Sequence, residues 1–440
     1  MVDAKYLPTI IGGLLALFHL SFFRSLYWAP GLDGGYYVLQ VQSLIQGEPL
    51  FGDSSIVFLL LRGFAWCTGD IVLGNELFVA LCSGGTATFL LMAGRVLGAD
   101  RMGVGCAGVY LISSTLFLGF SNEFVKNAFG LLVWSAQLWL LCSHRYVWAF
   151  LMLLLASFAH KLSAGLCVLS FFILFPKPQN ILRVLPIFFI PFVGLFAFAD
   201  LERIFLGFEW PHMRLNKLWN MELPKYALRE LLLLHGLPLL SLVFLRKYRW
   251  RIFLLAFLFS AWGFPLQRDE LSWRFLIMAF VPIALFFMLN RNRIFSLLCL
   301  MIMLPHALDG QRWLKSQQPN YGQWLEVIPR LQEHIQQDRV VAHRGVCGFV
   351  WAVGGITCEN FEPQEIEGTW RIVYGIHSSA LVKGMSNIQF APIALLPGYA
   401  LLREEDYQKI RKEKGFRIFF HPRNPYRSRP SYVYRKDDSK

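Results

Sequence analysis

The chain is poor in charged residues. Asp, Glu, Lys and Arg make up only 16% of its 440 residues, whereas a soluble domain has about 25%. Several apolar runs approach the roughly 20 residues needed to cross a bilayer. These features exclude an ordinary soluble enzyme and indicate a polytopic membrane protein. In a membrane protein the positions of the basic residues are more informative than the net charge of +13. No nucleic acid is expected as a partner.

Several sequence signals are also missing. The eight cysteines form no CxxC pair and no Cys/His cluster with metal-ligand spacing. The first apolar segment has no A-x-A cleavage pattern, which favours a retained span over a signal peptide. No Asn-x-Ser/Thr sequon occurs. We therefore expect a prokaryotic protein of the bacterial inner (plasma) membrane.

Eleven apolar segments are predicted to span the membrane. Segments 36–46 and 56–68 are instead predicted to be interfacial helices, because the first is amphipathic and the second is too short and interrupted by Arg62. In the first of these, Tyr37 and Val41 are predicted on the apolar face and Gln40 on the polar face. The predicted spans are 7–27, 73–94, 102–120, 126–142, 146–159, 162–176, 183–200, 228–245, 250–267, 273–289 and 294–308.

Alternate connections between these spans differ in charge. One set carries twelve Lys and Arg against two acids, and the other set within residues 1–308 carries eleven against thirteen. The positive-inside rule places the first set in the cytoplasm. An odd number of spans then places the C-terminal region outside. The twelve basic residues are Lys5, Arg95, Arg101, Arg145, Lys177, Arg183, Arg246, Lys247, Arg249, Arg251, Arg291 and Arg293.

The composition becomes that of a soluble domain from about residue 309. We expect a transmembrane domain over 1–308 with an outer loop over 28–72, a small extracytoplasmic α/β domain over 309–421, and a basic flexible tail over 422–440. Strands are predicted at 340–342 and 371–374 and a charged helix at 403–414. Cys347 and Cys358 fall in this domain, where an oxidising compartment would permit a disulfide.

The outer side gathers the candidate functional residues. Asp33 is the first acid after the first span, in the stretch Gly31-Leu32-Asp33-Gly34-Gly35-Tyr36-Tyr37. Ionisable groups near membrane depth are costly and are functional candidates. The others on this side are Glu123, Lys126, His160, Lys161, Arg268, Glu270 and Arg274.

This pattern resembles the GT-C superfamily of polyprenyl-phosphate-sugar-dependent glycosyltransferases, in particular its protein mannosyltransferase and aminoarabinose transferase branch. The resemblance rests on an acid just after the first span, two following tyrosines, a small amphipathic helix ending at Gly47, a second interfacial segment ending at Thr68-Gly69, a span ending in Arg95-Val96-Leu97-Gly98 and an outer loop near 121–127. It implies a GT-C-like membrane fold and transfer of a sugar from a lipid-phosphate donor to a glycan, lipid or protein acceptor.

The chain departs from that family in its acids. Members often carry a paired acid, but Gly34 and Gly35 follow Asp33, and the later loop offers Glu123 or the non-acidic Lys126-Asn127. No cofactor is assigned, and a divalent metal remains an open alternative.

The residues themselves suggest roles. A sugar phosphate has a good leaving group, so the reaction needs a base for the acceptor hydroxyl and cations for the departing phosphate. Asp33 is the candidate base; its alternative role is to cap the following helix. Lys126, Lys161, Arg268 and Arg274 are candidates for the phosphate, with contact to lipid headgroups as their alternative.

Three further residues are weaker candidates for support or as a second acid. For Glu123 and Glu270 the preferred explanation is pairing with Lys126 and Arg274, three and four residues later. For His160 the preferred explanation is packing in a tight hairpin.

Two other classes of function compete with an enzyme. A transporter or flippase usually buries charge near the bilayer midplane and contains inverted repeats, whereas here the charges gather at one face and no repeat is evident. A non-catalytic scaffold that presents the C-terminal domain to a partner is the second alternative.

Overall fold

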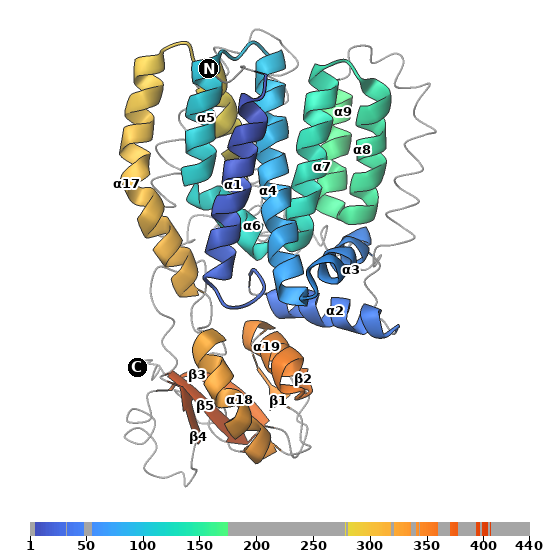
Figure 1. The fold of residues 1–440 in the computed structure, drawn as a ribbon, viewed down its shortest axis with the longest axis vertical. Coiled ribbons are helices and arrows are strands. Elements are labelled where there is room, and N and C mark those ends of the chain that lie inside the picture. Colours follow the sequence, from blue (N-terminus) through green and yellow to red (C-terminus); the bar gives the residue numbers. More distant parts are fainter. Residues whose placement is uncertain are drawn as a thin grey trace, which may run out of the picture. The chain divides into compact units, whose positions relative to one another are not determined.

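The computed structural model describes the helical N-terminal part of the chain and much of the C-terminal part. The described residues are 5–31, 33–47, 55–174, 278, 280–317, 321–335, 340–342, 344–359, 370–376, 393–396, 398–403 and 405. The chain divides into two compact units (Figure 1). The first comprises Met1–Ser25, Phe51–Met221 and Lys225–Leu314, and the second comprises Leu26–Leu50, Glu222–Pro224 and Lys315–Lys440.

The described part of the first unit is helical. Three of its helices, α1, α4 and α7, are long and apolar enough to cross a membrane, and the bent pair α5–α6 would make a fourth span. The chain is therefore a multi-pass integral membrane protein. The helices are α1 (Leu7–Arg24), α3 (Ile56–Thr68), α4 (Ile71–Val96), α5 (Arg101–Ser113), α6 (Thr115–Glu123), α7 (Val125–Cys142), α8 (Tyr146–Ala159), α9 (Lys161–Leu174), α16 (Phe280–Leu289) and α17 (Arg293–Gln317), the last of which runs slightly past the boundary of the unit.

Many predicted spans coincide with these helices. The predicted span at 102–120 corresponds to the bent pair α5–α6, whose two helices meet at 54°. The break falls at Ser114, whose backbone is extended and whose Oγ accepts a hydrogen bond from the Phe117 amide at 3.1 Å. A hydroxyl inside an apolar run thus starts a new helix. The predicted spans at 183–200, 228–245 and 250–267 lie outside the described residues.

Small residues bring α1 and α4 together. A Cβ on Gly12 would lie 2.5 Å from the Gly84 carbonyl oxygen, and one on Gly84 would lie 2.5 Å from that of Gly12. Close approach of this kind is the usual way for helices to associate in lipid. Across α7 and α9, the Trp134 Nε1 donates to the Ser170 Oγ at 2.7 Å, which satisfies two polar groups within the bundle.

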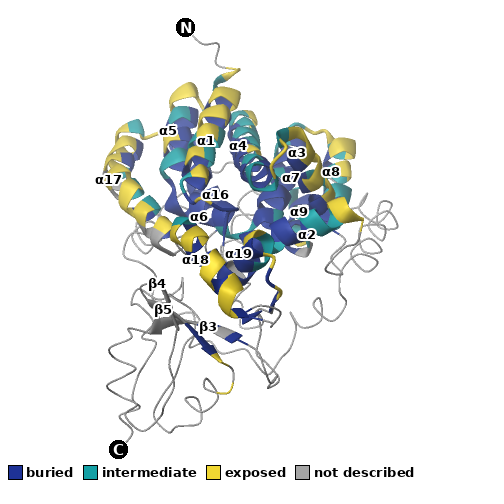
Figure 2. Ribbon diagram, turned by 60° about the horizontal axis from the view of Figure 1, so that its bottom comes forward, coloured by how far each residue is buried: buried dark blue, intermediate teal, exposed yellow. Residues whose placement is uncertain are grey.

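The outward faces of several helices are apolar. On α17, large side chains such as Ile294, Met301 and Leu308 are more than half exposed, and Figure 2 shows the exposed residues along this helix. In water such a face would be unfavourable, but in a bilayer it contacts lipid. The burial pattern therefore agrees with the membrane assignment.

Basic connections gather at one end of the first unit. The connections α4–α5, α7–α8 and α16–α17 lie at one end (Figure 1), where the Arg293 Nη2 contacts the Asp100 Oδ1 at 2.6 Å. This end carries the basic residues that were predicted to face the cytoplasm. Those in the described part of these connections and helix ends are Arg95, Arg101, Arg145, Arg291 and Arg293.

The second unit combines helices with a five-stranded sheet. The strand order is β2-β1-β3-β5-β4; β1 is parallel to β2 and β3, and β5 is antiparallel to β3 and β4. The elements are α2 (Gly34–Gln46), α18 (Tyr321–Ile335), β1 (Val340–Val341), α19 (Arg344–Gly354), β2 (Cys358–Glu359), β3 (Trp370–Ile376), β4 (Ile393–Leu396) and β5 (Gly398–Arg403).

The predicted strands are present, but the start of the predicted helix was wrong. Segments 340–342 and 371–374 correspond to β1 and to part of β3. The expected helix at 403–414 fails at its first residue, because Arg403 ends β5 and its guanidinium lies 4.5 Å from the centre of the Trp370 ring on β3. Glu405 is helical, and residues 404 and 406–414 lie outside the described residues.

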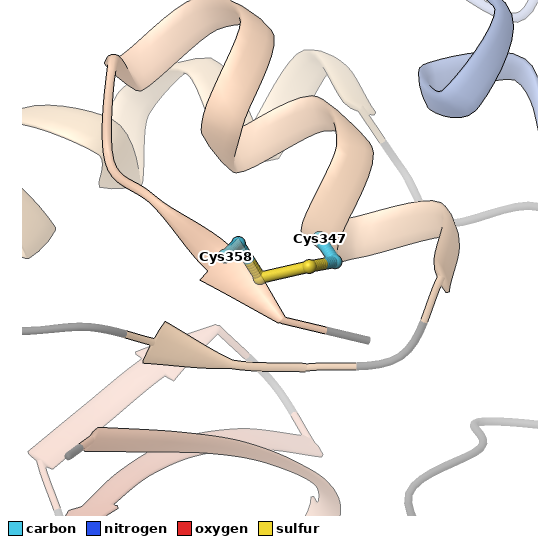
Figure 3. Close-up of a disulfide and its surroundings, with 2 residues drawn as sticks. All are labelled: Cys347 and Cys358. Atoms are coloured by element: carbon cyan, nitrogen blue, oxygen red, sulfur yellow. A yellow bond between two sulfur atoms is a disulfide. The ribbon is translucent and has the colours of Figure 1, made fainter. Parts of the chain in front are cut away.

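A disulfide fixes α19 to the sheet. Cys347 in the first turn of α19 is bonded to Cys358 at the start of β2, with their Cα atoms 5.3 Å apart (Figure 3). The sequence left this bond open.

Candidate active site

Asp33 stands at the N-cap of α2. Its carbonyl oxygen accepts a hydrogen bond from the Tyr37 amide at 3.3 Å, and its side chain is half-buried. In the described structure, the Asp33 carboxylate accepts no hydrogen bond from the first-turn amides of α2. The backbone thus occupies a capping position while the carboxylate does no capping.

Two other aspartates provide a direct comparison. The Asp70 Oδ1 accepts from the Val72 and Leu73 amides at 2.7 and 3.2 Å, at the start of α4. The Asp100 Oδ1 accepts from the Gly103 amide at 2.6 Å, at the start of α5. Both are ordinary N-caps. Asp33 differs from them, which argues against capping as the whole role of its carboxylate.

The glycines after Asp33 are required by close packing. A Cβ on Gly34 would collide with the Ala29 carbonyl group, and a Cβ on Gly35 would collide with the backbone of Gly348 in α19. Gly31, two residues before Asp33, has a φ of 80°, which favours glycine. The glycine-rich sequence around Asp33 therefore forms a turn packed within the second unit.

The predicted division of α2 into a polar and an apolar face was wrong at Gln40. This side chain was placed on the polar face and is fully buried. The reason is that α2 packs on α19 and buries the continuous run 37–41. The burial pattern of α2 is therefore set by its contact with another helix. The helix was assigned to the outer loop of the transmembrane domain, and it groups instead with the C-terminal part of the chain.

Glu123 and Lys126 flank the junction between α6 and α7. Glu123 ends α6, and its Oε1 accepts a hydrogen bond from the Asn122 Nδ2 at 2.9 Å. The Lys126 Nζ lies 4.9 Å from the centre of the Phe58 ring of α3, a cation–π contact. Both side chains are half-buried, so the junction holds an acid and a cation at one end of the unit.

His160 has a structural contact that its sequence did not reveal. It lies between α8 and α9, where its Nδ1 accepts a hydrogen bond from the Leu162 amide at 3.2 Å and its carbonyl oxygen accepts from the Ser163 Oγ at 2.7 Å. The ring thus caps α9, and this contact fits the packing alternative. Lys161 begins α9; its side chain, and Arg268, Glu270 and Arg274 entirely, lie outside the described residues.

One ion pair was missed by the sequence reasoning. The Arg24 Nη1, at the end of α1, donates to the Glu76 Oε2 of α4 at 3.0 Å, and the Glu76 side chain is 1% exposed. Glu76 is the only Asp, Glu, Lys, Arg or His in the predicted span 73–94. An acid inside a span is a functional candidate by default, so the signal was present and was not used.

Three buried asparagines lie in the same end turns as these residues. Asn75 leaves both side-chain polar atoms, and Asn122 and Asn127 leave Oδ1, without a hydrogen-bond partner in the described part of the chain. Unpaired buried polar groups cost about 1–3 kcal/mol each, so water or a ligand is expected to satisfy them.

The described residues form no group of three or more His, Cys, Asp or Glu that could hold a metal ion. The chain matches no known family model and no curated protein. The assignment of function therefore depends on the chemistry of these residues. Glu123, Lys126 and His160 belong to the first unit, and Asp33 belongs to the second.

Proposed function

We propose that the chain is an integral membrane glycosyltransferase of the GT-C type, with about eleven spans. It would transfer a sugar from a polyprenyl-phosphate donor to a glycan, lipid or protein acceptor on the non-cytoplasmic face, in a bacterial inner membrane. The observation that carries the proposal is the carboxylate of Asp33, which occupies an N-cap position without capping α2, unlike those of Asp70 and Asp100.

In this reaction Asp33 takes the proton of the acceptor hydroxyl. The hydroxyl oxygen bonds to the anomeric carbon as the bond from that carbon to the phosphate oxygen breaks, and the electron pair leaves with the polyprenyl phosphate. Attack from the face opposite the phosphate inverts the anomeric carbon, and a single base is sufficient because the leaving group needs no proton.

Cations would stabilise the negative charge that develops on the departing phosphate. Lys126, Lys161, Arg268 and Arg274 are assigned this role, with Glu123, His160 and Glu270 in support. The half-buried position of Lys126 against Phe58 supports its assignment, because a cation shielded from bulk water attracts phosphate more strongly than an exposed one.

The outward location is supported by two independent features. The Cys347–Cys358 disulfide fits an oxidising compartment. The basic connections gather at one end of the first unit (Figure 1), and Glu123, Lys126 and His160 lie in connections of the other set, as the positive-inside rule requires for an outward-facing site.

The test is the substitution Asp33→Asn in purified, monodisperse protein. Asparagine is as good an N-cap residue as aspartate but cannot accept the proton, so turnover should fall about 10²–10⁴-fold while donor binding persists. Asp70→Asn is the matched control, since it changes an aspartate that does cap a helix, and it should transfer normally. Near-normal transfer by Asp33→Asn would contradict the assignment.

A further inference from the structure

The backbones of Gly35 in α2 and Gly348 in α19 touch. A Cβ on Gly348 would lie 2.5 Å from the Gly35 Cα, and a Cβ on Gly35 would fall on the Gly348 backbone. Contacts between backbone atoms cannot yield as the end of a flexible side chain can. The two helices therefore cross at a position that excludes any side chain on either residue.

A second contact joins the same part of α19 to the chain before Asp33. The ring of Phe349 lies 4.9 Å from that of Trp28, edge to face, and 5.1 Å from that of Tyr321 in α18. Trp28 and Phe349 are both buried. Asp33 thus lies in sequence between Trp28 and Gly35, which contact two consecutive residues of α19.

The disulfide adjoins this pair of residues. Cys347 immediately precedes Gly348, and its bond to Cys358 ties the first turn of α19 to β2 (Figure 3). β2 pairs with β1 in the sheet. The part of α19 that carries both contacts is therefore the part that is covalently fixed to the sheet.

We propose that the segment 347–349, locked by the Cys347–Cys358 disulfide, is the positioning element for Asp33. The importance of this positioning for catalysis rests on the proposed role of Asp33 as the base. The segment acts through the turn between Trp28 and Gly35, so that the location of the carboxylate depends on the C-terminal part of the chain. A purely structural disulfide would stabilise α19 and the sheet without affecting α2.

Hydrogen exchange of the full-length protein, measured by mass spectrometry, tests the positioning directly. Gly348→Ala should accelerate exchange in residues 34–46 about tenfold or more, because it separates α2 from α19 while the disulfide stays intact. Gly354→Ala is the matched control in the same helix, since the three nearest atoms to its Cβ belong to the side chains of Ile328 and Ile356, at 3.3 to 3.5 Å, and none is backbone. Equal protection of α2 in the two variants would overturn the proposal.

The double substitution Cys347→Ser/Cys358→Ser provides the second variant. It should also accelerate exchange in α2 while α4 stays protected, which shows that the first unit remains folded. Faster exchange in residues 344–359 with unchanged exchange in α2 would overturn the proposal, because the disulfide would then serve α19 alone.

Transfer kinetics give the catalytic readout. A displacement of about 1 Å costs about a hundredfold in rate, so Gly348→Ala should lower kcat at least about tenfold with little change in donor KM. An equal loss of kcat in Gly354→Ala would contradict the proposal that the segment 347–349 positions Asp33. If wild-type protein transfers no sugar, the proposed function fails, and the exchange data still decide whether the segment holds α2.

Discussion

Arg24 and Glu76 form an ion pair with one buried partner and one half-exposed partner. Their contact is 3.0 Å, with 1% of the Glu76 side chain and 55% of the Arg24 side chain exposed. The buried Glu76 carboxylate therefore depends on Arg24 to balance its charge. The Arg24 guanidinium depends less on Glu76, because water can solvate it.

This asymmetry predicts different costs for the two substitutions. Arg24→Ala should lower the free energy of unfolding by about 1–3 kcal/mol, because it leaves a buried charge unpaired. Glu76→Gln should cost less, since it removes the charge and retains a hydrogen-bond acceptor. Thermal unfolding in detergent measures both, and an equal or reversed order would show that Glu76 does not need the guanidinium.

The Asp100–Arg293 pair predicts a pH dependence. Burial raises the pKa of Asp100, but the Gly103 amide and the Arg293 guanidinium outweigh it and hold the pKa below its ordinary value. A lowered pKa in the folded state stabilises the protein above the unfolded pKa of about 4, and this stability is lost as pH falls through the folded pKa.

The substitution Asp100→Asn tests this sign. The variant should be less stable than the wild type at pH 6, and the difference should shrink as the pH falls below about 4 and through the lowered pKa of folded Asp100, where its carboxylate becomes protonated. The measurement is the thermal midpoint of both proteins between pH 3 and 6. A difference that stays constant with pH would contradict the prediction, because it could not come from the charge of Asp100.

Residue labelling tests the orientation of the membrane domain. Cysteines introduced at Gly52 and Ser428 should react with an impermeant reagent from outside the cell, and cysteines at Asp100, Gln179 and Asn292 should not, because basic connections stay in the cytoplasm. Exposed Cys67 is replaced by serine beforehand. Labelling of Gly52 and Ser428 from opposite sides would make the odd span count wrong.

Local structure was predicted well wherever the sequence carries its own start and stop signals. The segment 56–68 matches α3, because Ser55 accepts a hydrogen bond from the Val57 amide at its start and Gly69 takes a left-handed conformation at its end. The long span 73–94 similarly lies within α4. Such signals act within a few residues, so they can be read without knowing the fold.

Features set by distant contacts could not be predicted in this way. The helical pattern of α2 gave a helix but not its partner, and the contact between Gly35 and Gly348 joins opposite ends of the chain. The break at Ser114 was missed although Ser113, Ser114 and Thr115 are a local run of hydroxyl residues, because the longer segments on both sides of that run are apolar. For the site, sequence reasoning found Asp33 but did not anticipate that its carboxylate leaves α2 uncapped.

Lys126 gives the sharpest test of the phosphate-binding role. Its ammonium lies over the Phe58 ring at the start of α7, whereas Arg62 on the neighbouring α3 is exposed and has no assigned role. Lys126→Gln should raise the donor KM about tenfold with a smaller effect on acceptor KM, because the donor carries the negative charge. Arg62→Gln is the matched loss of one positive charge and should change donor KM less than about twofold. If both variants weaken donor use equally, the cations attract lipid headgroups generally, and Lys126 holds no phosphate.

The substitution Lys126→Arg separates the charge of this side chain from its shape. Retained donor use would mean that the positive charge alone is required. A loss like that of Lys126→Gln would show that the compact ammonium over Phe58 is needed.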